Sequence, residues 1–487
     1  MTNLSGANLN RREATGPKGE GRDSPSNFPR YPEYKDSGVE WLGEVPAHWE
    51  VKRLRYVAEL NPSKTEVRTL PVERSVSFIP MEAVGEDGSL SLVQTRPIGE
   101  VLAGYTYVRE GDVTIAKITP CFENGKGAVM RGLENRVGFG TTELIVLRPK
   151  ASWTTSEYLY RVVSSEPFRV LGESSMYGAG GQKRVPDDFV RNFTIAWPPY
   201  KEQIEIQAFL DHETARIDAL VKEQQRLIAL LKEKRQAVIS HAVTKGLNPD
   251  VPMKDSGVEW LGEVPEHWGV RGLTKLIGPV VDYRGRTPTK VDDGVFLVTA
   301  RNIRNGRIDY EISKEYVTSE SVKSLLQRGM PEIGDLLFTM EAPLGQVALI
   351  DRTDIALAQR IVKFRAVKGL MINTYLMYWL MSTGCQSRME TLATGSTALG
   401  IKASKLGMIE CPVPPVTEQI EIVNLIERES SKHDILLAEA QTNIDLLRER
   451  RSALISAAVT GKIDVRGWQP PASSAGATGE ATQVEAE

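Results

Sequence analysis

Residues 35–46 read KDSGVEWLGEVP, and residues 254–265 read KDSGVEWLGEVP again. Chance does not place the same twelve residues twice in one chain, so the sequence is first interpreted as an internal duplication. Each copy runs on into a His-Trp pair, which gives two leaders at 34–49 and 253–268. The 487 residues are enough for two or three domains with their own cores.

A second box also occurs twice and opens a long segment with helical periodicity. PPYKEQIEI at 198–206 matches PPVTEQIEI at 414–422, and neither Pro nor Gly interrupts 201–244 or 417–460. Apolar residues recur there every seven positions, which predicts two helices of about 43 residues, roughly 65 Å each. Helices of this length are expected to pair as a coiled coil, and ordinary core helices are the alternative. The expected seam is Leu210, Ile217, Leu220, Leu227, Leu231 and Val238 in the first helix and Leu437, Ala440, Ile444, Leu447 and Leu454 in the second.

Two segments of mixed character lie between the boxes. Short β-rich runs separated by turns predict strands at 76–79, 112–118, 143–147, 295–299, 335–339 and 361–364, and helical patches are expected at 157–163 and 373–381. Little residue identity survives between the two segments, although the flanking boxes stayed alike. This contrast indicates two modules on one scaffold that perform different versions of one task. The expected division is a disordered extension (1–30), a first module (31–197), a helix (198–247), a second module (248–413), a helix (414–464) and a disordered tail (465–487).

Composition and charge narrow the class of protein. The chain is 41% hydrophobic and 25% charged with a net charge of −3, as in an ordinary soluble globular protein. No apolar run is long enough for a transmembrane helix, no signal peptide is evident, and the three cysteines form no pattern, so a cytoplasmic location is expected. Lysine and arginine outnumber acidic residues by 19 to 17 in 51–197 and by 19 to 14 in 271–413. These mildly basic modules are compatible with DNA binding or with a plain solvated surface.

The paired boxes, leaders and long helices resemble the specificity subunit of type I restriction-modification systems. The resemblance covers about residues 34–464 and extends to GTTE at 140–143 and AQR at 358–360, which are similar to the family's sequence before its late strands. It implies an α+β fold in which two tandem α/β target recognition domains are separated by two long helices, packed as an antiparallel coiled coil with pseudo-twofold symmetry. Each domain would read one half of a split, asymmetric sequence in double-stranded DNA.

The same resemblance implies a subunit that performs no chemistry itself. Two modification subunits would bind it and methylate adenine with S-adenosylmethionine, and motor and nuclease subunits would use ATP and magnesium. No cofactor or metal is expected in this chain, and no membrane partner. Half-sites on B-DNA must be met at a fixed spacing, because the duplex repeats about every 34–36 Å, and a stiff helical pair provides such a spacing.

The residues themselves offer no catalytic constellation. None of the five histidines lies inside a variable module, and no Walker-type loop is present. Trp197-Pro198-Pro199-Tyr200 looks like an amino-methyltransferase loop, but that loop needs Asp or Asn first to accept a hydrogen bond. A Pro-Pro turn that starts a helix is the simpler interpretation. A self-contained DNA methyltransferase with duplicated recognition domains, and a coiled-coil interaction protein without a DNA role, remain as alternatives.

Two sets of residues are candidates for function. Side chains that can reach base edges or phosphates are expected on loops late in each module and beside its central strands. For each single residue, an exposed polar side chain without a DNA role is an equally good interpretation. These candidates are Lys117, Asn124, Lys126, Gln182, Lys183 and Arg184 in the first module and Arg301, Asn302, Arg304, Gln346, Ser396, Thr397 and Lys402 in the second. Residues expected to serve the scaffold or a partner subunit are Trp41, Trp49, Trp260, Trp268, Glu202, Gln203, Glu418 and Gln419. The leaders are expected to dock on the helix ends or on a modification subunit, or simply to brace each module.

Overall fold

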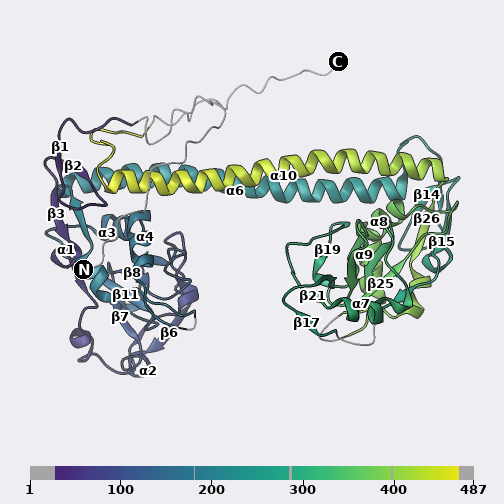
Figure 1. Cartoon of the computed structure of the whole chain (residues 1–487). Helices are drawn as coiled ribbons and strands as arrows, with labels where there is room; N and C mark the ends of the chain where they lie inside the picture. Colours follow the sequence, from purple (N-terminus) through teal and green to yellow (C-terminus); the bar gives the residue numbers. More distant parts are fainter. Residues whose placement is uncertain (1–27, 180, 284–287, 396–398, 471–487) are drawn as a thin grey trace, which may run out of the picture. The chain divides into compact units, whose positions relative to one another are not determined.

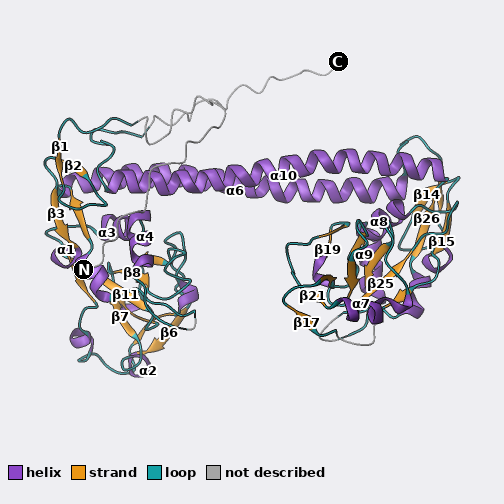
Figure 2. Ribbon diagram, viewed as in Figure 1, coloured by secondary structure: helices purple, strands orange, loops and turns teal. Residues whose placement is uncertain are grey.

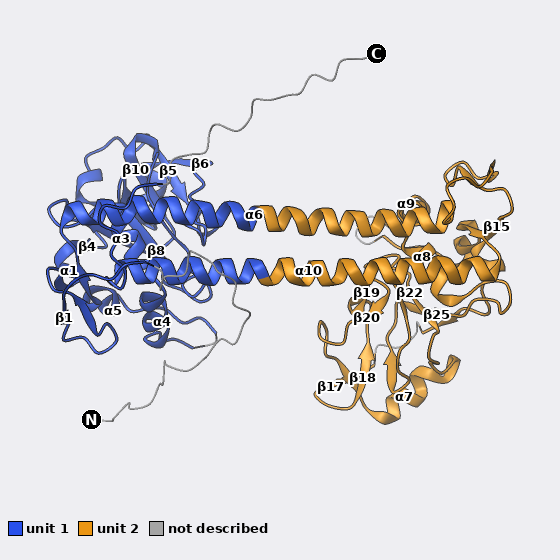
Figure 3. Cartoon of the chain, turned by 90° about the horizontal axis from the view of Figure 1, so that it is seen from above, with its two compact units in different colours: residues 1–222, 443–487 blue, residues 223–442 orange. Residues whose placement is uncertain are grey.

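The computed structural model describes residues 28–179, 181–283, 288–395 and 399–470. The chain divides into two compact units, unit 1 with residues 1–222 and 443–487 and unit 2 with residues 223–442 (Figure 3). The helices α6 (Tyr200–Lys245) and α10 (Val416–Val459) each contribute to both units. A long helix is therefore shared between the units and does not form a domain of its own.

In the described part of the first module, two four-stranded sheets carry helices on their flanks (Figures 1 and 2). Their strand orders are β6-β5-β10-β7 and β4-β11-β8-β9, and only the β5–β10 pair is parallel among the pairings in these sheets. The elements are β1 (Tyr34–Asp36), β2 (Glu44–Pro46), β3 (Glu50–Arg53), α1 (Leu54–Val57), β4 (Ala58–Leu60), β5 (Ser75–Ile79), β6 (Gln94–Pro97), α2 (Ile98–Val101), β7 (Thr106–Arg109), β8 (Val113–Ala116), β9 (Gly127–Val129), β10 (Val137–Gly140), β11 (Leu144–Pro149), α3 (Ser156–Val163), α4 (Glu166–Ser174), α5 (Asp187–Asn192) and β12 (Thr194–Trp197).

The described part of the second module repeats this construction. Its sheets have the orders β16-β25-β22-β23 and β17-β21-β18-β24, with β18 and β24 parallel. The elements are β13 (Met253–Asp255), β14 (Glu263–Pro265), β15 (Gly269–Gly272), β16 (Val281–Asp282), β17 (Lys290–Val291), β18 (Val295–Val298), β19 (Ile303–Arg304), β20 (Arg307–Ile308), β21 (Tyr316–Val317), α7 (Ser319–Leu325), β22 (Leu336–Thr339), β23 (Val347–Leu349), β24 (Ile355–Leu357), β25 (Ile361–Phe364), α8 (Asn373–Met381), α9 (Thr383–Leu392), the 3-10 helix η8 (Ala403–Met408) and β26 (Glu410–Val413). All six predicted strands and both predicted helical patches are present, within one to two residues at most ends.

A buried carboxylate marks the same place in both modules. Asp112, just before β8, accepts two hydrogen bonds of 2.8 Å from the Arg148 guanidinium on β11. Asp335, just before β22, lies 2.7 Å from both Lys363 and Arg365. Each central sheet is therefore fixed by a charge pair, because a buried carboxylate is stable only when it is paired and hydrogen-bonded.

Within each unit the two long helices pack antiparallel through a heptad seam. The predicted seam of α10 is confirmed, since Ala440, Ile444 and Leu454 are buried and the other two predicted members are half-buried. In α6, Leu210, Ile217 and Leu231 are buried as predicted.

The second predicted row of α6 was wrong. Leu220 and Leu227 are exposed at 46% and 42%, and the seam instead uses Thr214 and positions seven and fourteen after it. An α-helix has 3.6 residues per turn, so residues three and four positions after Leu210 both lie on the same face as Leu210. The row four positions after it begins with Thr214, a polar residue that the search for apolar residues passed over.

The first residues of the expected disordered tail (465–487) are packed in unit 1, and residues 471–487 lie outside those that the structure describes. Val465 is buried in the core of unit 1, and the Trp468 ring packs edge-on against Phe209 with the centroids 5.3 Å apart. Phe28, inside the expected disordered extension, packs on Phe209 in the same way at 5.1 Å. The aromatic surface of α6 therefore orders residues that their composition alone assigns to a tail.

The leader of unit 1 is held by one carboxylate at the start of α6. The Glu202 side chain accepts hydrogen bonds from the Trp49 indole (2.9 Å) and the Tyr31 hydroxyl (2.6 Å), and its second oxygen lies 2.7 Å from His48 Nε2. Burial, together with the bond to Glu202, raises the pKa of Tyr31 above its ordinary value. The leader also reaches the end of α10, where Lys462 donates to the carbonyls of Leu42 and Glu44.

Unit 2 repeats this arrangement with its own residues. Glu418 at the start of α10 accepts from the Trp268 indole (3.1 Å) and lies 2.8 Å from His267 Nε2. At the end of α6, Lys245 donates to the Glu263 carbonyl, and Gly246 lies against the Trp268 ring. Each leader therefore joins the first turn of one long helix to the last turn of the other.

The glutamine after each glutamate fixes the module itself. Gln203 donates to the carbonyls of Trp153 and Pro198, and Gln419 donates to those of Leu370 and Pro414. The outer leader tryptophans lie farther from the helices. The Trp41 ring stacks on Phe193, and the Trp260 indole donates to Glu410.

Replacing Trp49 by phenylalanine tests this anchoring. The substitution removes a buried bond to a charged group, and we expect it to lower the free energy of unfolding by about 1.5–3 kcal/mol more than Trp197→Phe does. Trp197 is a matched control, since its buried indole nitrogen has no hydrogen-bond partner among the residues that the structure describes. Urea unfolding of the full chain measures both variants, and equal losses would contradict the anchoring role.

Candidate nucleic-acid interface

Three loops of the first module meet at one edge of its sheets. The backbone amide of Lys117, after β8, donates to the carbonyl of Glu143, and Val185 donates to the carbonyl of Lys117. Thr119 in turn donates to the carbonyl of Lys183. The loop after β8, the turn before β11 and the late loop that precedes α5 are thus fixed side by side, and they carry four of the predicted DNA contacts: Lys117, Gln182, Lys183 and Arg184.

The second module brings the equivalent loops together with the same backbone pattern. Met340, after β22, donates to the carbonyl of Arg360 in the turn before β25, and Ile401 donates to the carbonyl of Met340. Among the predicted residues of this module, Lys402 lies on the late loop with an exposed side chain. Ser396 and Thr397 lie outside the residues that the structure describes.

The described residues of each loop cluster include an ion pair, but the charges come from different loops. In the first module the guanidinium of Arg184, on the late loop, donates two hydrogen bonds of 2.9 and 2.8 Å to Glu143 in the turn. In the second module the cation is Arg360 in the turn, and its Nε lies 3.4 Å from Glu341 on the loop after the central strand. The backbones correspond while the charge pattern is rearranged, so the two surfaces present different groups at equivalent positions.

The Arg184–Glu143 pair has an electrostatic consequence. Hydrogen bonds from Arg184 hold the pKa of the Glu143 carboxyl below its ordinary value of 4.5. The carboxylate in turn raises the pKa of Arg184. The pair uses the Nε and Nη2 donors of Arg184 and leaves the Nη1 donors outside it. Arg184 therefore orders the loop and keeps donors for a further acceptor.

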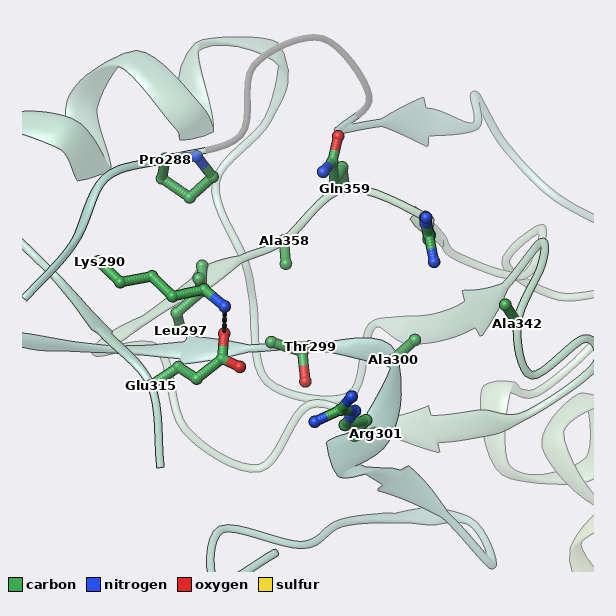
Figure 4. Close-up of a pocket in the computed structure, with 11 residues that line it drawn as sticks. Pro288, Lys290, Leu297, Thr299, Ala300, Arg301, Glu315, Ala342, Ala358 and Gln359 are labelled. Carbon is green, nitrogen blue, oxygen red and sulfur yellow. Dashed lines mark ion pairs between the residues drawn. The ribbon is translucent and has the colours of Figure 1, made fainter. Parts of the chain in front are cut away.

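A cavity of about 270 Å³ opens beside the loop cluster of the second module (Figure 4). It lies at the ends of the parallel strands β18 and β24, and Thr299, Arg301 and Gln359 line it. Lys290 and Glu315 form an ion pair of 2.8 Å on its wall. The cavity therefore combines hydrogen-bond donors and acceptors of the kind that read base edges or phosphates.

Other predicted residues lie apart from this cluster. Asn124 is exposed and donates to Glu86, and Lys126 donates to the carbonyl of Met81, so both are on the far part of the loop after β8. Arg304 is exposed, and its Nε donates to the carbonyl of Arg301. Gln346 lines a different cavity, together with residues of α6 and α9.

Asn302 requires a correction. Its side chain is fully buried, accepts from the backbone and the hydroxyl of Thr299, and donates to the carbonyls of Asp309 and Ser313. Both the oxygen and the nitrogen of its side-chain amide bond within the protein. Asn302 therefore holds the loop after β18, and we remove it from the proposed DNA contacts. An asparagine among arginines gives the same sequence signal whether it faces solvent or caps a turn.

Sequence reasoning also missed residues of the cluster. Glu143, Glu341, Gln359 and Arg360 were not among the predicted contacts, although three of these belong to the stretches that carry the resemblance. Arg360 has a φ of 78°, a conformation that L-residues seldom adopt. Its strained backbone was not visible in the sequence, and Tyr177, 68% exposed beside Arg184, gave no signal either.

The described residues contain no group of three or more His, Cys, Asp or Glu side chains that could hold a metal ion. In the same part of the chain, no helix has both the length and the apolar surface needed to cross a membrane.

Comparison with known proteins gives concordant matches. Residues 280–441 match the family model described as the type I restriction modification DNA specificity domain. The chain is 39% identical over 189 residues to the EcoEI type I restriction enzyme specificity subunit of Escherichia coli, an alignment that covers 38% of this chain and 31% of that subunit. It is 26% identical to the EcoAI specificity subunit of the same organism over 85% of this chain and 83% of that subunit.

Structural comparison extends the match to most of the chain. A solved structure from work on the complex assembly and conformational transition of the type I R-M system superimposes with a TM-score of 0.65 at 16% identity. The superposition covers 85% of this chain and 98% of the solved one. This similarity confirms the expected fold, two mixed modules with a pair of long helices.

Replacing Glu143 by glutamine tests the ion pair of the first module through its pH dependence. The wild-type carboxyl titrates lower in the folded protein than its ordinary 4.5, so its charge stabilises the folded state above that pH, and the stabilisation is lost as the pH falls through the lowered pKa. Because both groups are partly exposed, we expect the free energy of unfolding of wild type to exceed that of Glu143→Gln by about 0.5–1 kcal/mol at neutral pH.

Chemical unfolding between pH 7 and acid pH measures the difference. It should shrink on acidification, and Arg184→Gln should show the same shrinking gap because it removes the same pair from the other side. A gap that stays constant with pH would show that the pair contributes nothing through charge.

Proposed function

We propose, from the premise that the chain belongs to the specificity subunits of type I restriction-modification systems, that it reads a bipartite asymmetric sequence in double-stranded DNA. The first module reads one half and the second module reads the other. The chain performs no chemistry of its own. It directs adenine methylation by two modification subunits that use S-adenosylmethionine, and ATP-dependent restriction by motor and nuclease subunits.

The observation that carries this proposal is the pair of loop clusters. Three loops converge in each module through the same backbone bonds, yet Arg184 with Glu143 in one corresponds to Arg360 with Glu341 in the other. Direct readout depends on which donors and acceptors stand at the groove. Two frameworks of equal geometry with different charges therefore suit two half-sites of different sequence.

The long helices suit the spacing that such a target requires. At about 1.5 Å per residue, the 46 residues of α6 extend for roughly 70 Å, close to two turns of B-DNA. A heptad seam makes the pair stiff, whereas a flexible linker would let the half-site separation vary. The helices therefore support a target whose two halves are separated by a fixed number of base pairs.

The exposed surface of the leaders supports two copies of one partner. The twelve repeated residues have the same pattern of buried and exposed positions in both copies. Packing in the core of each unit explains the buried identical residues, such as Val45 and Val264, but Lys35, Glu40 and their counterparts Lys254 and Glu259 are exposed. Identical exposed groups on a chain whose modules diverged fit a surface that meets the same subunit twice.

The alternative of a self-contained methyltransferase receives no support from the geometry. Trp197, in the place where that chemistry needs Asp or Asn, is buried in the core of unit 1 and packs on Tyr158. The Pro-Pro pair simply begins α6, with the Pro199 carbonyl accepting from Gln203.

Methylome sequencing tests the recognition function. We expect a methylation-free host that expresses this chain with its modification subunit to methylate adenine in both halves of one split, asymmetric motif. Exchanging residues 270–413 for those of a relative should change one half of the motif and leave the other half and the spacer unchanged. A motif that changes in both halves would contradict one module per half-site, and methylation by this chain alone would overturn the non-catalytic role.

Charge reversal tests the leader surface. We expect Lys35→Glu combined with Lys254→Glu to weaken assembly with the modification subunit by at least tenfold in Kd, because both copies of the docking surface change sign. The matched control is Lys323→Glu combined with Lys368→Glu, which reverses two exposed charges of the second module outside the leader. Analytical ultracentrifugation of the mixed subunits measures assembly, and unaltered affinity of the double variant would contradict the docking role.

A further inference from the structure

An arginine-rich cavity lies between the first module and α10, wholly within unit 1. Its volume is about 260 Å³, and its lining includes Arg161 from α3, Arg169 from α4 and both Arg448 and Arg451 from α10. The Tyr160 ring lies among these guanidinium groups, and Glu86 is the acidic residue of the lining. None of the four arginines belongs to the predicted DNA contacts or to the loop cluster described above.

Two of the four arginines are held by hydrogen bonds to aspartates, and a third lies at the outer limit of ion-pair distance from one. Arg161 donates to Asp211 at 2.7 Å, Arg451 donates to Asp218 at 3.0 Å, and Arg448 lies 4.0 Å from Asp445. A guanidinium carries five N–H donors, and one carboxylate oxygen engages only one or two of them. The anchored arginines are therefore oriented while part of each group stays available.

Arg169 differs from the other three. Its Nε is buried and has no hydrogen-bond partner among the described residues, and no ion pair joins it to a carboxylate there. Its Nη1 approaches Gly125 so closely that a Cβ at that position would lie 3.3 Å away. A buried guanidinium donor without an acceptor is costly, and an anion in the cavity would supply one.

Unit 2 contains a neutral counterpart of this cavity. Two equivalent bonds define the correspondence: the backbone of Glu166 donates to Ser456 in unit 1, and that of Thr383 donates to Ser240 in unit 2. The counterpart has a volume of about 290 Å³, and no residue of its lining is charged.

Gln386 occupies the place of Arg169 in that counterpart. Its oxygen would lie 2.8 Å from a Cβ at Gly345, just as Arg169 meets Gly125, and its amide donates to the carbonyls of Gly345 and Leu380. The same architecture thus holds a satisfied neutral amide in unit 2 and an unsatisfied cation in unit 1. The cation is therefore a property of this cavity and not a requirement of the fold.

We propose that the arginine cavity of unit 1 binds a phosphate group. Convergent guanidinium groups favour phosphate over smaller anions, because their planar forks match its oxygens. A phosphate of the DNA backbone and free inorganic phosphate present the same chemistry to the cavity. The first source rests on the proposed DNA-reading function, and the second does not.

Two measurements on the full-length chain test the proposal. The first is the thermal unfolding midpoint with and without inorganic phosphate at constant ionic strength. The second is the salt dependence of affinity for a duplex that lacks the target. Both are made on wild type, Arg169→Gln and Arg448→Gln, and on Arg68→Gln, which removes the same charge from an exposed position outside the cavity. Arg169→Gln copies the residue that already fills this place in unit 2, and Arg448→Gln is the second variant in case the first folds poorly.

We expect phosphate to raise the midpoint of wild type and Arg68→Gln but not that of Arg169→Gln, with Arg448→Gln intermediate. If the source is the DNA backbone, Arg169→Gln also lowers the slope of log affinity against log salt by about one, while Arg68→Gln keeps the wild-type slope. A lost phosphate effect with an unchanged slope identifies free phosphate as the ligand.

The proposal is overturned if both cavity variants match Arg68→Gln in both measurements. Failure of wild type to bind any duplex would contradict the proposed function, and the phosphate measurement would still decide the cavity.

Discussion

The structure depends on two carboxylates, Glu202 and Glu418, each placed in the first turn of a long helix. Each accepts a hydrogen bond from a tryptophan indole and lies beside a histidine, both from the leader of its own module. The same leaders contact the last turn of the other helix through Lys462 and Lys245. Glu202 is buried and Glu418 is half-buried, and a carboxylate removed from water without such donors is costly, so the boxes and the leaders are constrained together. This coupling explains why two distant stretches of the chain are both repeated.

Around these anchors the modules are free to diverge. One sheet in each module keeps the same order of strands, β4-β11-β8-β9 and β16-β25-β22-β23, and the same buried aspartate before the central strand, in Asp112 and Asp335. The loops at the sheet edge keep their backbone bonds but exchange the positions of acid and base. The arginine cavity and its neutral counterpart follow the same rule, since Arg169 and Gln386 occupy one framework. Backbone geometry is thus held constant where it positions a loop, and side-chain chemistry changes on the surfaces proposed to bind DNA or phosphate.

Sequence reasoning succeeded where a pattern reports one physical cause. The six strands and two long helices were predicted because alternation and heptad spacing directly reflect burial. The α6 seam failed at Leu220 and Leu227 because an apolar residue on a long helix need not face its partner, and Thr214 took the expected place. Asn302 failed because a turn-capping amide and a base-reading amide look alike in sequence. Glu143, Arg360 and Arg169 were missed because their roles arise from residues that are brought together only by the fold, in one case with a strained backbone.

Under the proposed function, the shared seam limits how the distance between half-sites can change over evolutionary time. Ala440 and Ile444 on α10 and Ile217 and Leu231 on α6 face inward only in one mutual register. Seven residues added to one helix alone would leave either the packing in one unit or a leader at one end without its partner. A lengthened spacer therefore has to arise as a concerted change in two separate places of the gene, whereas a new target sequence needs a change in only one module. In this architecture the target sequence is therefore expected to change more readily during evolution than the spacing between its halves.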